Sequence, residues 1–264
     1  MGLGFFEVIS NSGPIVLVLS VVAVLYTFLV FRKSIRAVKV KEKEIAGFNP
    51  RAAIKDRKRL FIGMPMLFGT ILLLMFKDTI VQKTGLSLDN STIVLTAAFS
   101  ALLIFKEHPG EALRHFVDWE TVFFFMGLFI VVGSLDQTHV VAALGHGLVA
   151  LSHGSDNILQ FLVTVGSGLF SVFIDNIPYN ITMIGALQSI AHTGVYVYPL
   201  WWALNLGTSI GGVGSPIGAA CNVVALGQAH KEGMAIQFGK YLAVGVPFVI
   251  LSSLIAFVMI WLRY

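Results

Sequence analysis

Long apolar stretches separated by short polar connections organise most of this 264-residue chain. A helix needs roughly 20 residues, with 17 still sufficient, to cross about 30 Å of hydrocarbon. The pattern predicts uninterrupted membrane-spanning helices over the ranges 13–31, 60–76, 92–105, 120–135 and 238–262. The third range is short, and we expect it to extend into Asn90 and Lys106. The sequence therefore predicts an all-α polytopic membrane protein.

Two breaks interrupt the remaining apolar sequence. Asp-Asn-Ile-Pro at 175–178 separates two apolar pieces, 158–174 and 177–191, each at or below the minimum length for a span. A re-entrant helical hairpin over about 157–193 fits these lengths better than two crossings, although two crossings preserve the same topology. Gly-Gly-Val-Gly-Ser-Pro-Ile-Gly at 211–218 predicts one discontinuous helix over about 199–229. Secondary transporters use such pairs of breaks to build a site at the membrane midplane.

Composition supports the membrane class. The chain is 56% hydrophobic and 12% charged, whereas a soluble domain carries about 25% charged residues. The single cysteine, Cys221, excludes an intramolecular disulfide and a cysteine-based metal cage, and we expect it to be a small packing residue. No Ser-His-Asp spacing, His-Glu-x-x-His motif or phosphate-binding loop indicates an enzyme.

Charge predicts the orientation of the chain. Eleven of the eighteen Lys and Arg residues lie between 32 and 59, so the net charge of +4 does not indicate nucleic-acid binding. The positive-inside rule makes this loop cytoplasmic, with Lys39 and Lys58 inside and Ser152 outside. The predicted organisation is a first span within 1–31 that ends a preceding repeat, a basic loop over 32–59, and a transport repeat over 60–264.

Asp175 is the first candidate for a functional residue. A carboxylate inside a membrane segment is costly and usually marks an ion or substrate path. At a hairpin tip, Asp175 could bind a cation or carry a proton, while backbone amides, Asn176 and Asn180 could hold an anion or polar solute. The alternative is an ordinary turn outside the membrane, because Asp and Asn also favour turns.

The glycine-rich break has two interpretations. Gly207, Gly211, Gly214 and Gly218 form two GxxxG spacings, which are typical of close helix packing. Pro216 favours true unwinding, which would expose backbone amides and carbonyls to ions. The candidate substrate- and ion-binding residues of both breaks are Asp175, Asn176, Asn180, Thr182, Thr208, Ser209, Gly211, Gly212, Gly214, Ser215 and Asn222. Na⁺ or H⁺ is the expected coupling ion at these residues, and no resident metal or cofactor is expected.

Two other clusters have structural interpretations. His139, His146 and His153 are spaced by seven, so they share one face of an amphipathic helix over 138–153. Neighbours on that face lie roughly 10 Å apart, too far for one metal ion. Four aromatic residues form a predicted interfacial belt, Tyr196, Tyr198, Trp201 and Trp202.

The motifs resemble those of a known group of transporters. Val-Asp-Trp-Glu-Thr at 117–121, Asp-Asn-Ile-Pro at 175–178 and the stretch 206–224 resemble the arsenite-permease and sodium–proton-antiporter branch of the ion transporter superfamily, which also contains citrate carriers. The resemblance covers the C-terminal half of such a permease. It implies two inverted repeats, each with one hairpin and one discontinuous helix. Carboxylate carriers of the superfamily tend to have Ser-Asn-Thr at the tip, so Asp-Asn-Ile-Pro favours the antiporter or arsenite branch.

The main functional hypothesis is a multi-pass secondary active ion transporter of the plasma membrane, present as its C-terminal half. Its expected partners are membrane lipid, a small inorganic ion or organic anion, and a complementary N-terminal half or second copy. The alternatives are a Na⁺-coupled carboxylate carrier and a non-transporting membrane subunit or scaffold. A channel is a weaker alternative, because no ring of charges or carbonyls resembles a pore lining.

Overall fold

The computed structural model describes residues 4–37, 54, 56–85, 88–115, 117, 119–192 and 194–264. In these residues the secondary structure is helical, without a strand. Three of the described helices are long and apolar enough to cross a membrane, α1 (Phe5–Ala37), α3 (Arg57–Thr84) and α13 (Phe238–Arg263). The all-α polytopic class predicted from the sequence is confirmed. Most of the predicted basic loop, Lys39 included, lies outside the described residues.

Residues 1–10 and 36–122 form the first of two structural units. It contains α3, α4 (Asn90–Phe105) and α5 (Pro109–His115). The side chain of Asp56 caps α3 by accepting a hydrogen bond from the Arg59 N–H at 3.0 Å. Arg59 also pairs with Glu107, just beyond α4, at 2.8 Å. No residue of α3 is buried, so its apolar side chains remain available to lipid or a partner.

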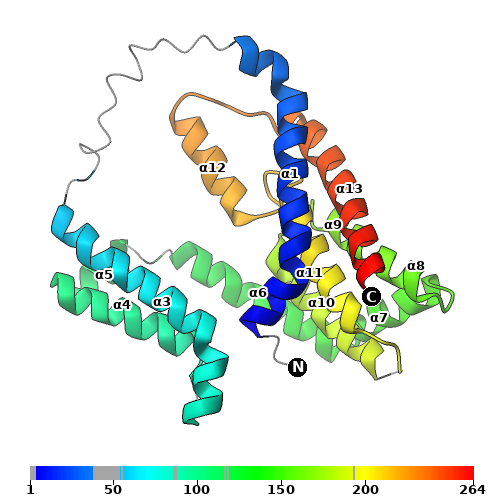
Figure 1. Ribbon diagram of the computed structural model, residues 1–264, viewed down its shortest axis with the longest axis horizontal. Coiled ribbons are helices and arrows are strands. Elements are labelled where there is room, and N and C mark those ends of the chain that lie inside the picture. The colour runs from blue at the N-terminus through cyan, green and yellow to red at the C-terminus, as the bar shows by residue number, and fades with distance from the viewer. Residues whose placement is uncertain are drawn as a thin grey trace. The chain divides into compact units, whose positions relative to one another are not determined.

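Residues 11–35 and 123–264 form the second unit. Its elements are the main part of α1, most of α6 (Trp119–Gln137), α7 (Val140–Leu151), α8 (Asp156–Phe161), the π-helical turn η2 (Leu162–Gly166), α9 (Ser167–Phe170), α10 (Asn176–Ala191), α11 (Tyr198–Gly212), α12 (Ala220–Lys231) and α13. Figure 1 shows α10 and α13 beside α11, which contacts both. Eleven of the fifteen residues of α11 are buried, so it is the central helix of this unit.

Both breaks predicted from the sequence interrupt helical structure. The helical segment α8–η2–α9 leads into a turn over 171–175, from which α10 returns. Phe170 and Tyr179 stack across this turn, with ring centroids 6.3 Å apart. The second break separates α11 from α12 over residues 213–219. Pro199 lies in the first turn of α11, where its missing N–H leaves no intrahelical bond unmade.

The segment after α6 differs from the amphipathic surface helix expected over 138–153. Segments 122–135 and 140–151 of α6 and α7 together are apolar enough for one span, broken by a bend of 66°. α7 packs closely on α10, because a side chain on Gly145 would lie 2.7 Å from the Ala186 carbonyl oxygen. Only His146 of the three histidines lies within α7, since His139 precedes the helix and His153 follows it.

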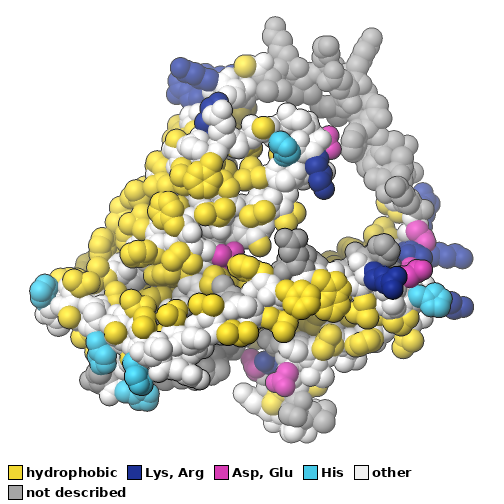
Figure 2. All heavy atoms as spheres, turned by 180° about the vertical axis from the view of Figure 1, so that it is seen from behind, with side chains coloured by type: hydrophobic (Ala, Val, Ile, Leu, Met, Phe, Trp, Pro, Cys, Tyr) yellow, Lys and Arg dark blue, Asp and Glu magenta, His cyan; other side chains and the backbone are white. Residues whose placement is uncertain are grey.

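Much of the surface is apolar. Hydrophobic side chains cover a large part of the face seen in Figure 2. In the second unit, Leu17, Val24 and Leu262 are among the exposed hydrophobic residues, each at 70% or more. Apolar surface on this scale fits lipid contact rather than water.

Candidate functional site

The hairpin tip is organised by Asp175. Its backbone is extended, and its side chain accepts a hydrogen bond from the Ile177 N–H at 3.0 Å, so Asp175 is the N-cap of α10. An Asp in this position satisfies an N–H that has no partner within the helix. Pro178 in the first turn is compatible with this start. The Asp175 side chain is half-buried and keeps oxygen lone pairs available for a ligand.

The second break is held open by Ser215 and Asn222. Ser215 is fully buried, and its hydroxyl donates to the Val172 carbonyl while accepting from the Gly218 N–H at 3.0 Å. The Asn222 amide nitrogen donates to the Gly212 carbonyl at 2.7 Å and to the Ser215 carbonyl at 2.8 Å. These bonds replace the helical bonds that the chain loses between α11 and α12. From the sequence we expected Asn222 only as a ligand, so this structural role was not predicted.

The two breaks meet. The Asn176 N–H donates to the Gly218 carbonyl at 3.1 Å, which joins the hairpin tip directly to the unwound segment. The Ser171 hydroxyl donates to the Thr208 carbonyl at 3.1 Å on the same side of α11. We call this region, residues 171–182 and 207–222, the junction. It brings together residues that are more than thirty positions apart in the sequence.

The predicted site residues divide into two groups. Asp175, Asn176 and Asn180 are half-buried and Ser209 is exposed; within the described residues, the Asn176 and Asn180 side chains make no hydrogen bond. The hydroxyls of Thr182 and Thr208 instead donate back along their own helices, to the carbonyls of Pro178 at 3.0 Å and Leu204 at 2.8 Å. The first group is accessible for a ligand at the junction, and the second is already used by the fold.

The glycines serve packing and unwinding at different positions. A side chain on Gly207 would collide with the Thr164 carbonyl, and one on Gly211 with the Gly168 carbonyl. These two glycines therefore let α11 approach η2 and α9 closely. Gly212 ends α11, while Gly214 and Gly218 lie in the unwound segment, where side chains would meet Val172 at 2.6 Å and the Gly212 carbonyl at 2.9 Å. Both interpretations of the glycine-rich sequence thus apply.

Helix ends give the junction both signs of partial charge. α10 and α12 begin there, and α9 and α11 end there. Helix N-termini favour anions, and C-terminal carbonyls favour cations. An arrangement with half-helix ends of both kinds can hold an anionic substrate and a coupling cation close together.

Two expectations from the sequence need correction. Cys221 is exposed rather than packed in the interior, because no residue of α12 is buried. Trp202 is 1% exposed and packs edge-on against Tyr198, so it belongs to the core rather than to an interfacial belt. The described residues contain no group of three His, Cys, Asp or Glu side chains arranged to hold a metal ion.

The chain is similar to proteins of bacteria and animals. It is 34% identical over 274 residues to a 46 kDa membrane protein of Mycobacterium leprae, a match that covers all of the chain and 60% of that relative. An uncharacterized transporter of Mycobacterium tuberculosis is 32% identical over 267 residues, with the same coverage of 100% and 60%. The P protein of Mus musculus is 31% identical over 222 residues, covering 81% of the chain and 26% of that protein.

The chain thus spans about 60% of the length of its mycobacterial relatives. No solved structure matches it. The family model described as citrate transporter matches residues 1–207. The superfamily resemblance is confirmed at this level, and the matching family is of the citrate type that was the alternative on sequence grounds. The chain belongs to the CitMHS citrate transporter family.

Proposed function

We propose that this chain forms part of a secondary active transporter in which the junction holds the transported ion or anion. The observation that supports the proposal is the hydrogen bond from the Asn176 N–H to the Gly218 carbonyl at 3.1 Å. It ties the hairpin tip to the helix break, so Asn176, next to Asp175, lies beside Gly212 at the end of α11 and Gly218 before α12. Membrane transporters place substrate and coupling ion between such broken helices.

The residues of the junction have distinct proposed roles. The Asp175 carboxylate binds Na⁺ or carries the coupling proton. The side-chain amides of Asn176 and Asn180, which have no hydrogen-bond partner among the described residues, hold the oxygen atoms of the solute. Gly212 and Gly214 contribute backbone carbonyl oxygens, while Asn222 positions the carbonyls of Gly212 and Ser215.

Two substrate classes are compatible with the junction. The match to the citrate transporter family favours a small organic anion such as a carboxylate. The Asp-Asn-Ile-Pro tip favours cation–proton exchange or arsenite transport, because a carboxylate at the tip repels a second carboxylate unless a cation or proton neutralises it. A non-transporting membrane subunit of the same fold is the rival from another class.

Substitution of Asp175 tests the proposal. Asp175→Asn is nearly isosteric and retains an oxygen that can cap α10, so we expect insertion and folding to persist while coupled flux is abolished. The matched control is Asp156→Asn, which changes an exposed acid in the first turn of α8, away from the junction. Flux is measured in proteoliposomes that hold associated copies of the chain or the chain with a complementary half, with citrate gradients in one arm and Na⁺ and pH gradients in the other. Unchanged flux and unchanged Na⁺ and pH dependence in Asp175→Asn would show that Asp175 has only a structural role.

A further inference from the structure

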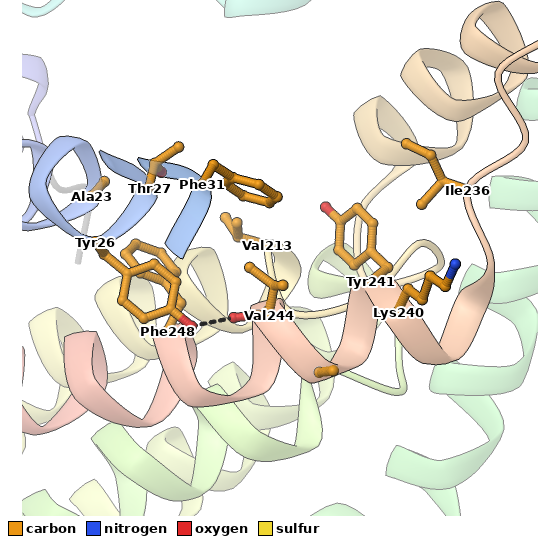
Figure 3. A pocket seen from close by; sticks show the side chains of 12 residues that line it. Ala23, Tyr26, Thr27, Phe31, Val213, Ile236, Lys240, Tyr241, Val244 and Phe248 are labelled. Carbon is orange, nitrogen blue, oxygen red and sulfur yellow. Dashed lines mark hydrogen bonds between the residues drawn. The ribbon is translucent and has the colours of Figure 1, made fainter. Parts of the chain in front are cut away.

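A groove between α1 and α13 lies beside the second break. Its volume is about 730 Å³, and most of its lining is apolar. Figure 3 shows Tyr26 of α1 beside Phe248 of α13 at one end of the groove, Tyr241 and Lys240 of α13 towards the other, and Val213 of the unwound segment between them. Val213 belongs to the junction, and the other lining residues of the groove lie outside it.

α1 and α13 touch through Tyr26 at one part of the groove. The Tyr26 hydroxyl donates to the Val244 carbonyl at 2.7 Å, and the Tyr26 and Phe248 rings lie 5.3 Å apart. From Phe248 the groove extends towards Lys240, which also lines it. Eight helical residues correspond to about 12 Å. The space is therefore an elongated apolar slot that ends at a lysine.

Positive charge collects at the end that Lys240 lines. α1 and α13 run antiparallel, because Asn11 near the start of α1 hydrogen-bonds Tyr264 at the end of α13, while Tyr26 contacts Val244. Arg32 and Lys33 directly follow Phe31, a lining residue, and they lie on the exposed last turns of α1. Lys240 belongs to the first turn of α13. The basic residues of both helices thus belong to the same end of the groove, the end predicted to be cytoplasmic.

We propose that this groove binds one phospholipid with an anionic headgroup. An acyl chain fills the apolar slot between Phe31 and Phe248, and the headgroup phosphate pairs with Lys240 and the basic end of α1. Basic pockets between membrane helices on the cytoplasmic side bind anionic headgroups. A transmembrane helix is a poorer occupant, because an apolar helix offers no anion to Lys240 at the basic end of the groove.

A bound lipid would touch the segment that opens the second break. Val213 lines the groove, and a side chain on Gly245 of α13 would collide with the Gly214 carbonyl, so α13 packs directly against the unwound backbone. Occupancy of the groove should therefore alter the environment of α12, which begins at Ala220. The exposed thiol of Cys221 is a natural reporter of that change.

Lipid retention tests the lipid-binding proposal without a transport assay. A negative result would therefore leave the proposed transport function standing. The purified chain in detergent is titrated with phosphatidylglycerol or phosphatidylcholine, and bound lipid is counted by native mass spectrometry. We expect preferential retention of phosphatidylglycerol and a loss of about fivefold in Lys240→Ala, the factor set by about 1 kcal/mol per basic residue near an anionic lipid. Lys231→Ala, which removes an exposed lysine of α12 outside the groove, should retain lipid like the parent.

A second variant distinguishes lipid binding in the groove from general attraction of lipid to surface charge. Ala243→Phe fills the slot without changing charge, so it should lower retention of both lipids and abolish the effect of phosphatidylglycerol on the maleimide-labelling rate of Cys221. Equal retention of the two lipids by the parent would overturn the proposal. So would equal losses in the Lys240→Ala and Lys231→Ala variants, or normal retention in Ala243→Phe.

Discussion

Gly211 and Gly227 are glycines of neighbouring helices with opposite surroundings. A side chain on Gly211 would collide with the Gly168 carbonyl, a backbone atom that cannot turn away. Gly227 lies inside α12 and is exposed, and a methyl group added there would have no neighbouring atom within 4 Å. The same residue type therefore allows close packing at one position and only weakens the helix at the other.

This contrast gives a paired prediction. Gly211→Ala should destabilise the protein by about 1–3 kcal/mol, the usual cost of overpacking. Gly227→Ala should stabilise it by about 0.5–1 kcal/mol, because alanine is the better helix former. Thermal unfolding in detergent compares the two variants with the parent. A Gly211→Ala protein as stable as Gly227→Ala would contradict the close approach of α11 to α9.

The sequence did not predict that Asn222 stabilises the break between α11 and α12. Its side-chain amide binds the carbonyls of Gly212 and Ser215 across the break. Asn222→Ala leaves both carbonyls without this partner, and each partly buried orphan costs about 1–3 kcal/mol. We expect a lower unfolding temperature and faster proteolysis within 213–219. Asn157→Ala, at an exposed position of α8, is the control and should change neither quantity. Equal stability of the two variants would show that Asn222 does not hold the break.

At the scale of elements, local chemistry made the breaks predictable. Asp175 and Pro178 start a helix, and Pro216 with its neighbouring glycines stops one, so both interruptions could be located from sequence alone. The direct bond between Asn176 and Gly218 could not be located, because backbone contacts between distant segments leave no pattern in the sequence. The interruption between α6 and α7 was predicted, but the possibility that the two helices form one broken span was not. The bend lies near His139, a non-glycine residue with a positive φ of 59°, which propensity does not predict.

Packing adds a contact of α7 that the sequence did not predict. The glycines of α7 were unremarkable in a single sequence, yet Gly145 faces the Ala186 carbonyl and Gly185 of α10 faces Val141 at 2.7 Å. The two helices therefore approach each other through reciprocal glycines. The histidine spacing that indicated an amphipathic surface had no bearing on this contact.

The orientation of these elements can be tested by cysteine accessibility. On a Cys221→Ala background, Lys58→Cys should react with an impermeant maleimide only after the membrane is permeabilised, and His153→Cys should react from outside in intact cells. Position 153 replaces Ser152, the external position predicted from the sequence, because Ser152 is 2% exposed and would label poorly. Labelling of position 58 from outside in intact cells would reverse the predicted topology.

At the scale of the whole molecule, the polar lining of the junction is incompletely covered. Asp175, Asn176, Asn180 and Asn222 are half-buried, and Ser209 is exposed, in a chain whose surface is largely apolar. An unsatisfied polar group in hydrocarbon costs several kcal/mol. A pseudo-symmetric transport site also pairs one hairpin and one broken helix with a second set. We therefore infer that a complementary segment or a second copy of the chain covers the junction.

The exposed polar lining of the junction has a consequence for transport by a single chain. If a second hairpin and broken helix complete the site, the chain reconstituted as a monomer should show no coupled flux. Flux should appear when a complementary half is supplied or when two copies associate, and Asp175→Asn should abolish it in either case. The measurement combines proteoliposome uptake with the oligomeric state of the same sample, determined by single-molecule photobleaching of labelled protein. Robust uptake by vesicles that hold one chain each would show that the junction needs no second half.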